Sequence, residues 1–465
     1  MRSRCRKRNS HWGWLVFTAI LAAGYWFAPV TRPFSQTELD KLAANSELKN
    51  VQFKADVKEI FGQKTKVGAY LLEDKENPIV SVSFMFKNAG YASDNADEQG
   101  IAGMAAALLG EGAGTYSSDM LKEELETRAI KINFAADKDD FTGSMLTTKD
   151  NLTRAAELFN LILTEPRFEA DDVIRVKMQM LNALRRQNEN PNQVLLLEFN
   201  KELYGSHPYA RNPLGREADI EAVDQAKLHR FVKNKLIAKN LLVGIAGDIN
   251  EAEGARLLDM MFRGVPENGS LNFVRNADLQ FDGRSRTIDR NIGQNITLMA
   301  VKGAGRTDED FYPLYVANYV LGGAGLTSRL SQKIREEKGL TYGVYSYLQL
   351  DDKAPLIAAG FAATKDKYAE AEKLFEEQWR EFGAKGITQE ELDKAKKYLT
   401  ASNNLRFASI ENISAMLAMM QKYNLGLDFL QKRNEYISQI NLENVNRVIK
   451  KYFVPQMVSV KIGSF

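Results

Sequence analysis

The sequence predicts an α+β protein with two duplicated domains, each an antiparallel sheet packed with helices, preceded by one transmembrane helix. Three observations support this prediction. Short stretches rich in β-branched and aromatic residues alternate with polar ones, as in half-buried strands. The same order of strands and helices occurs twice along the chain, and a long uncharged stretch precedes both copies.

The composition is that of a folded, globular protein. Of the 465 residues, 26% are charged and 44% are hydrophobic, and this length gives room for two or more domains. The formal net charge is only +2, so a nucleic-acid partner is not expected. Cys5 is the single cysteine, which excludes an intrachain disulfide and a thiolate metal cluster.

The N-terminal segment has the pattern of a membrane anchor. Residues 12–30 carry no charge and follow a cluster of five basic residues. As a helix, this stretch would span roughly 28 Å at about 1.5 Å per residue, close to the thickness of a bilayer core. The basic flank predicts a single-pass protein of the bacterial inner membrane, with a cytoplasmic N-terminus and a periplasmic bulk.

A cleaved signal peptide is the alternative for this segment, because the apolar stretch is short and Ala22 and Ala23 are small. The chain would then be secreted to the periplasm. A lipoprotein is not expected, since Cys5 precedes the apolar stretch instead of following it. A buried globular helix fits poorly with the five preceding positive charges.

The elements that follow can be assigned in chain order. A polar spacer over residues 34–50 leads to a region in which strands and helices alternate. The patterns predict strands over 67–74 and 79–90, helices over 100–109 and 118–127, a β-hairpin over 130–148, and helices over 151–163 and 170–188.

An internal repeat defines the domain organisation. Thr148-Lys149-Asp150 opens TKDNLTRAAELFNLIL, and Thr364-Lys365-Asp366 opens TKDKYAEAEKLFEEQW. A strand and a helix precede each copy, and helices follow each copy. We therefore expect the following segments: a basic flank with an anchor or signal (1–33), a spacer (34–50), a first domain (51–265), an extended linker (266–290) and a second domain (291–465).

A search for catalytic residues excludes several kinds of site. The three histidines, His11, His207 and His229, are too far apart for a zinc-binding helix with two histidines one turn apart. We expect His207 to stabilise its loop. No GxSxG nucleophile motif is present, and GGAG (322–325) is better explained as a tight turn than as a phosphate loop.

Three aspartates, Asp137, Asp139 and Asp140, fall at the tip of the predicted hairpin. Acidic residues at such a position usually solvate a turn, and we expect no further role for them.

Several longer motifs point to a known family. LGGAGLTSRLSQKIREEKGLTYGVYSY (321–347), HPYARNPLGRE (207–217) and NLLVGIAGDIN (240–250) occur in an order and at separations that resemble the M16 peptidases. This family includes pitrilysin, insulin-degrading enzyme and the mitochondrial processing peptidase. The resemblance covers the chain after about residue 50 and implies paired α+β domains.

The chain departs from the family at the zinc site. The resemblance implies a His-x-x-Glu-His motif after Gly100-Ile101-Ala102 and a further glutamate before NENP (188–191). The corresponding positions are Gly103, Ala106, Ala107 and Ala183. Glycine and alanine have no side chain that binds zinc or activates water, so we expect no metal, no cofactor and no autonomous peptidase activity in this chain.

A second family feature is retained. Arg335 and Tyr342 match the arginine–tyrosine pair with which active relatives contact the substrate and the oxyanion at the zinc. A guanidinium donates to carbonyl oxygens, and a phenol can stabilise negative charge. Without the resemblance, the same residues would read as a surface arginine and a half-buried strand tyrosine.

The resemblance therefore implies a catalytically inactive subunit of a heterodimer. The partner would be a catalytic M16 subunit that supplies zinc, and this chain would supply Arg335 and Tyr342 in trans for hydrolysis of a peptide or unfolded protein. By the same resemblance, the peptide would add to a strand edge formed by Ile132, Asn133, Phe134, Ala135 and Ala136. The alternative is a peptide-binding or scaffold protein of a membrane complex with no proteolytic role.

Overall fold

The computed structural model describes residues 55–407 and 409–465. The expected anchor and spacer (1–33 and 34–50) lie outside these residues. Among the described residues, no helix combines the length and the apolar character that a membrane crossing requires.

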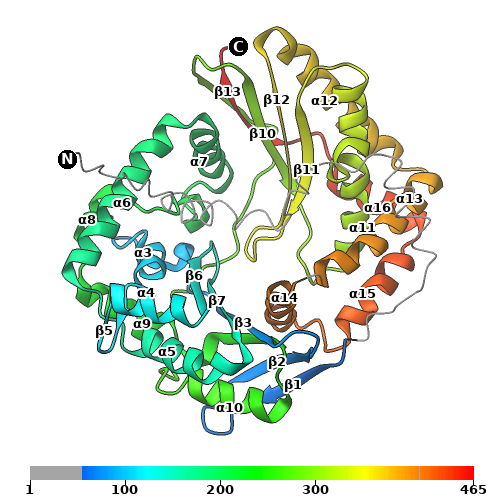
Figure 1. The fold of residues 1–465 in the computed structure, drawn as a ribbon. Coiled ribbons are helices and arrows are strands. Elements are labelled where there is room, and N and C mark those ends of the chain that lie inside the picture. Colours follow the sequence, from blue (N-terminus) through cyan, green and yellow to red (C-terminus); the bar gives the residue numbers. More distant parts are fainter. Residues whose placement is uncertain (1–54, 408) are drawn as a thin grey trace, which may run out of the picture. The chain divides into compact units, whose positions relative to one another are not determined.

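The first half of the described chain builds a six-stranded sheet (Figure 1). Its strands occur in the order β1-β2-β8-β3-β7-β6, and all neighbours are antiparallel except β2 and β8, which are parallel. The expectation of a purely antiparallel sheet is therefore wrong for this pair. The strands are β1 (Val57–Phe61), β2 (Gly68–Glu73), β3 (Ile79–Phe86), β6 (Lys131–Ala136), β7 (Phe141–Thr148) and β8 (Leu241–Gly247).

Helices cover this sheet and complete the first core. They are α3 (Ile101–Leu108), α4 (Ser118–Thr127), α5 (Leu152–Thr164), α6 (Ala170–Glu189), α8 (Glu217–Ala222), α9 (Gln225–Lys235) and α10 (Glu251–Met261), and a small ladder of β4 (Gly112–Ala113) and β5 (Tyr116–Ser117) lies among them. Phe84, Phe159 and Phe262 form edge-to-face ring pairs in the core. The hairpin predicted over 130–148 and the helix predicted over 118–127 are confirmed.

The second half builds a five-stranded sheet in the order β11-β12-β10-β13-β9. Again one pair, β9 and β13, is parallel. The strands are β9 (Ser285–Asp289), β10 (Asn295–Lys302), β11 (Gly343–Gln349), β12 (Leu356–Ala363) and β13 (Val458–Gly463). The helices are α11 (Phe311–Asn318), α12 (Lys365–Lys385), α13 (Gln389–Ala401), α14 (Ile410–Lys422), α15 (Phe429–Ser438) and α16 (Leu442–Tyr452).

The two sheets have corresponding topologies. β2, β8, β3, β7 and β6 of the first sheet match β9, β13, β10, β12 and β11 of the second in order and direction. This agreement explains the sequence repeat. Residues 285–289, which we assigned to an extended linker, instead form β9, because they hydrogen-bond to β13. The other domain limits stay predictions.

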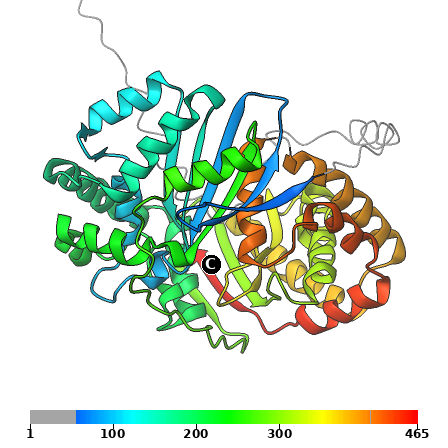
Figure 2. The same ribbon diagram turned by 90° about the horizontal axis from the view of Figure 1, so that it is seen from below.

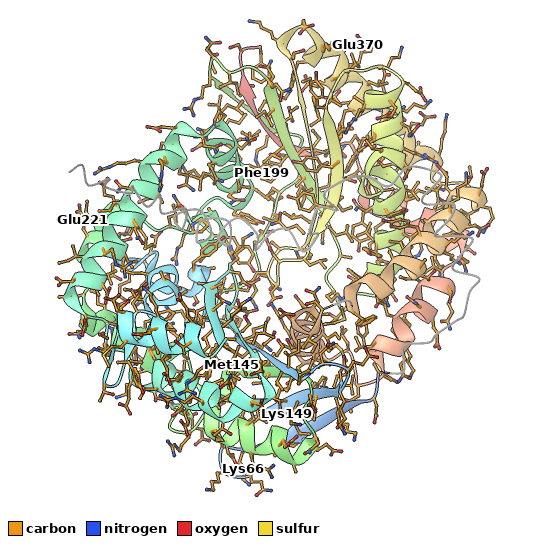
Figure 3. All side chains as sticks on the ribbon, in the orientation of Figure 1. Lys66, Met145, Lys149, Phe199, Glu221 and Glu370 are labelled. Carbon is orange, nitrogen blue, oxygen red and sulfur yellow. The ribbon has the colours of Figure 1, made fainter. Side chains whose placement is uncertain are left out.

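Each half contributes one helix to the sheet of the other. α14 packs against β8, β3 and β2 of the first sheet (Figures 1 and 2). α7 (Pro191–Tyr204) packs against β13 and β10 of the second sheet. Phe199 of α7, labelled in Figure 3, is 4% exposed and belongs to a cluster with Val458 and Val460.

The exchanged helix α14 explains an unexpected burial pattern in β3. Near-strict alternation predicts one solvated face, yet Ser81 and Ser83 are buried. Their hydroxyls lie 2.9 Å and 2.7 Å from the hydroxyl of Ser414 on α14. The polar face of β3 therefore contacts a helix, and its hydroxyls are satisfied there.

Candidate functional site

Helix α3 carries three of the four positions at which the family resemblance implies zinc-site residues. Gly103 and Ala106 are partly buried, Ala107 is exposed, and Ala183 on the neighbouring helix α6 is 6% exposed. A Cβ on Gly103 would meet only the carbonyl oxygen of Pro213, at 3.8 Å. There is space for a longer side chain at position 103, but glycine has no side-chain atom that could bind a metal.

These residues do not fit a zinc ion. Glycine and alanine offer no nitrogen, oxygen or sulfur ligand. Within residues 55–407 and 409–465, no group of three histidine, cysteine or carboxylate side chains could hold a metal ion. No catalytic step is therefore assigned to a metal in this chain.

The start of α3 is fixed by a buried carboxylate. Gly100 adopts a φ of 94° at the N-cap, and its N–H donates to Asp94 Oδ2 at 2.9 Å. Burial, the largest cause, raises the pKa of Asp94 to about 7. Asp94 and Lys235, both buried, line a cavity of about 70 Å³ together with Glu98 and Arg230.

The predicted peptide-binding residues lie in β6, the last strand of the first sheet. Asp137 N–H donates to Asp140 at 3.0 Å, so 137 and 140 are a hydrogen-bonded pair. Hydrogen-bonded and non-hydrogen-bonded pairs alternate along an antiparallel ladder. Ile132, Phe134 and Ala136 fall in the non-hydrogen-bonded pairs, so their N–H and C=O groups point away from β7. No hydrogen bond from a described residue reaches those groups, so this edge is open.

The corresponding edge strand of the second sheet, β11, is closed. Asn318 Nδ2 donates to the carbonyl oxygen of Ser346 at 3.2 Å, and the Ser331 hydroxyl donates to that of Val344 at 3.4 Å. Gly322 lies so near that a Cβ on it would be 2.4 Å from the nitrogen of Ser346. Side chains and helical backbone thus occupy the β11 edge, so of these two corresponding edges only that of β6 is free for strand addition.

Arg335 and Tyr342 lie on either side of a short turn. Arg335 belongs to a π-helical turn, Ser331–Glu336, and Tyr342 directly precedes β11. The Thr341 hydroxyl accepts from Gly343 N–H at 3.0 Å and so holds the backbone on both sides of Tyr342. The turn therefore gives Tyr342 a defined position.

Both side chains reach solvent. Tyr342 is 80% exposed, and the side chain of Arg335 is 39% exposed with its neighbour Glu336 at 3.4 Å. Among the described residues, no hydrogen bond or ion pair connects either side chain to α3. The structure thus presents this pair outward, without bringing it into contact with the degenerate zinc positions.

Sequence reasoning missed the role of the hairpin tip. Asp140 is 1% exposed and pairs with Lys422 at 2.6 Å, so it does not merely solvate a turn. The partner is distant in sequence, and no local pattern indicates it. The loop role of His207 is confirmed, because its Nδ1 accepts from Tyr209 N–H at 3.2 Å and its Nε2 lies 2.9 Å from the carbonyl oxygen of Arg275.

Comparison with protein families gives two matches. The family described as Insulinase (Peptidase family M16) matches residues 69–216, and the Peptidase M16 inactive domain matches residues 222–399. The chain belongs to the M16 peptidase family. The two matched segments are consecutive, and the second begins within the first half, so that it includes α9, β8 and α10.

Individual M16 proteins show the same relationship over most of their length. The chain is 27% identical to a non-peptidase homolog, YmxG, of Helicobacter pylori, over 81% of this chain and 88% of the relative. It is 24% identical to an uncharacterized zinc protease of Mycobacterium leprae, over 68% and 71% of the two chains.

Solved M16 structures share the fold. A peptidase M16 inactive domain from Pseudomonas fluorescens has a TM-score of 0.82 and 26% identity, and covers 88% of this chain and 98% of that chain. A protease from Helicobacter pylori has a TM-score of 0.78 at 18% identity, and covers 88% and 99% of the two chains, which shows the fold alone. These matches support the assignment to the M16 family and to its fold. At the four positions where the family resemblance implies zinc-site residues, this chain has glycine or alanine.

Proposed function

We propose that this M16 protein is the non-catalytic subunit of a heterodimeric zinc peptidase. The partner supplies zinc, its ligands and the general base. This chain supplies Arg335 and Tyr342 in trans and an open strand edge for the peptide. The observation that carries the proposal is the contrast between the two sites, since all four zinc positions are lost while the arginine–tyrosine pair is retained and exposed.

Each side chain has a defined task in this proposal. The Arg335 guanidinium donates hydrogen bonds to carbonyl oxygens of the bound peptide. The Tyr342 phenol donates to the oxygen that becomes negative when the peptide bond is attacked. The outward N–H and C=O groups of Ile132, Phe134 and Ala136 hold the peptide as an added strand.

The proposal places the protein in the bacterial inner membrane, with residues 12–30 as the anchor and the described residues in the periplasm. A cleaved leader would instead release it into the periplasm. The support is the uncharged stretch and its basic flank.

A peptide-binding protein without any proteolytic role is the second candidate. The open edge of β6 favours it, because strand addition needs no zinc. Exposed Arg335 and Tyr342 argue for the heterodimer, since peptide capture on β6 alone gives them no task.

Co-purification tests the proposal. The full-length chain is purified alone and with an M16 protein that carries His-x-x-Glu-His, and zinc content and peptide hydrolysis are measured for each sample. We expect zinc and activity only with the partner. Stoichiometric zinc or peptidase activity in the isolated chain would contradict the inactive-subunit assignment, and a stable homodimer that ignores the partner would favour the second candidate.

A further inference from the structure

Two corresponding turns of the repeat meet in the structure. The turn 137–140 joins β6 to β7, and the loop 350–355 joins β11 to β12. Asp352 N–H donates to Asp139 Oδ2 at 3.1 Å, and Lys138 forms an ion pair with Asp351. These bonds connect the two halves of the chain directly.

Lys422, the last residue of α14, binds both turns. Its Nζ lies 2.6 Å from Asp140 Oδ2 and 2.9 Å from Asp352 Oδ2, and its side chain is only 10% exposed. The next residue, Tyr423, donates to Asp352 Oδ1 at 3.1 Å. One ammonium group therefore forms ion pairs with one carboxylate from each turn, and a net negative charge remains.

Two tyrosines complete the contact. Tyr209 is fully buried, and its hydroxyl donates to Asp139 Oδ1 and accepts from Lys353 N–H at 3.0 Å. The Tyr204 hydroxyl donates to Asp351 Oδ2 at 3.3 Å. Because Tyr209 bonds to both turns, the Asp139 carboxylate is held against the second half.

Carboxylates outnumber ammonium groups in this contact. The ammonium group of Lys353 lies 5.7 Å from the centre of the Phe273 ring and thus has another neighbour. The titratable groups that face Asp139 from the surrounding elements are Asp137, Lys138, Asp140, Asp351, Asp352, Lys422, Tyr91, Tyr204, Tyr209 and Tyr423. Five aspartates, counting Asp139, thus share two lysines.

This excess of negative charge favours proton uptake. Burial, the largest cause, and repulsion from Asp352 raise the pKa of Asp139 to about 6. Burial and repulsion from Asp140 raise the pKa of Asp137 to about 7. Of the two, Asp139 contacts the second half, whereas the Asp137 carboxylate accepts N–H groups of its own turn, from Asp139 at 2.8 Å and Asp140 at 2.6 Å.

We propose that a proton on Asp139 controls the contact between the two turns. With the proton, the turns stay docked through Tyr209 and Lys422. Without it, the carboxylates of Asp139 and Asp352 repel each other across the junction, and the turns separate more often.

The sign of the pH dependence follows from the raised pKa. A carboxyl group whose pKa is higher in the docked state than in the separated state takes up a proton on docking. Proton uptake by Asp139 therefore stabilises the docked state fully below the pKa of Asp139 in the separated state, near 4. This stabilisation is lost as the pH rises through about 6, the pKa of Asp139 in the docked state.

The location of the contact makes it relevant to peptide binding. β6, with its open edge, leads directly into the turn that carries Asp139. Separation of the turns frees the end of that strand from the second half. This link to the bound peptide rests on the proposed function, but the proton control of the contact does not.

Hydrogen exchange of the full-length protein tests the inference. Protection of the backbone amides in 350–356, which include the Asp352 and Lys353 N–H groups of the contact, is measured at pH 5.0 and pH 7.5, after correction for intrinsic exchange rates. We expect about a tenfold loss of protection at the higher pH, because a pKa of about 6 in the docked state and near 4 in the separated state gives that ratio. Asp139→Asn, which is neutral at both pH values, should stay protected at both.

Asp119→Asn is the control, since it neutralises an exposed carboxylate on α4 that takes no part in this contact. It should keep the pH dependence of the wild type. Equal wild-type protection at pH 5.0 and 7.5, or a wild-type pH dependence in Asp139→Asn, would overturn the inference. The wild-type measurement alone shows whether the contact depends on pH. Neither result depends on peptide binding or on a zinc-bearing partner.

Discussion

A Cβ atom on Gly244 would lie 2.0 Å from the carbonyl oxygen of Ser414. Gly244 is in the middle of β8, and Ser414 is on α14, so strand and helix touch through backbone. The absence of a side chain at 244 is what allows the exchanged helix to reach the first sheet, where the Ser414 hydroxyl meets those of Ser81 and Ser83.

Gly244→Ala should therefore destabilise the protein. Backbone atoms cannot move aside as a flexible side chain can, so α14 must shift off the sheet, at a cost of about 1–3 kcal/mol or more. Thermal unfolding measures this change. Gly305→Ala is the control, since a Cβ at 305 meets no atom within 4 Å, and an equal loss of stability in both variants would contradict the close-packing explanation.

Ala136→Pro should weaken peptide binding to the edge of β6. Proline removes an outward N–H while leaving the ladder with β7 intact, because residue 136 does not donate to β7. One lost hydrogen bond and the bulk of the ring predict about a tenfold weaker Kd for an extended peptide. Fluorescence anisotropy with a labelled peptide measures the affinity.

Ala136→Val is the matched control for that variant, because it adds bulk and keeps the N–H group. Its affinity should stay close to that of the wild type. If the proline variant binds as tightly as the valine variant, the peptide does not pair with this edge.

Asp94→Asn should change how stability depends on pH. Burial raises the pKa of Asp94 to about 7, above its value in an unfolded chain. Its contribution to the stability of the folded protein is therefore present below about pH 4 and is lost as the pH rises to about 7. Asparagine stays neutral. The free energy of unfolding of the variant minus that of the wild type should therefore be larger at pH 8 than at pH 5, by more than about 1 kcal/mol.

Denaturant unfolding at the two pH values measures this difference. Asp119→Asn, at an exposed position in the first turn of α4, is the control and should follow the wild type. An Asp94→Asn variant whose stability falls with pH as steeply as that of the wild type would show that another group carries the effect.

Local patterns were sufficient for much of the fold. The hairpin of β6 and β7 and helix α4 follow from residue alternation and helical periodicity, which depend only on neighbouring residues. The repeat at Thr148 and Thr364 indicated two similar sheets, and the structure contains them.

Long-range pairing could not be derived in the same way. The exchange of α7 and α14, the parallel strand pairs and the buried Asp140–Lys422 ion pair join residues far apart in the sequence. A serine on β3 looks solvent-facing until Ser414 is placed beside it. Strand β9 has exposed side chains and only five residues, so its pattern resembles that of a loop.

The candidate site was only partly accessible from the sequence. The loss of a family motif identified four positions, Gly103, Ala106, Ala107 and Ala183. The retention of another motif identified Arg335 and Tyr342. That β6 is open while β11 is closed by Asn318 and Ser331 depends on tertiary contacts, which only the structure provides.

The most direct test concerns Arg335 and Tyr342 in the complex. The kcat/KM for peptide hydrolysis is measured with the zinc-bearing partner and either wild-type chain, Arg335→Ala or Tyr342→Phe, with Lys338→Ala as control. Both side chains reach solvent, so the variants should fold and assemble normally. Our account predicts a loss of about 100-fold in kcat/KM for each site variant and little change for the control. Unchanged activity in properly assembled complexes of both site variants would contradict it.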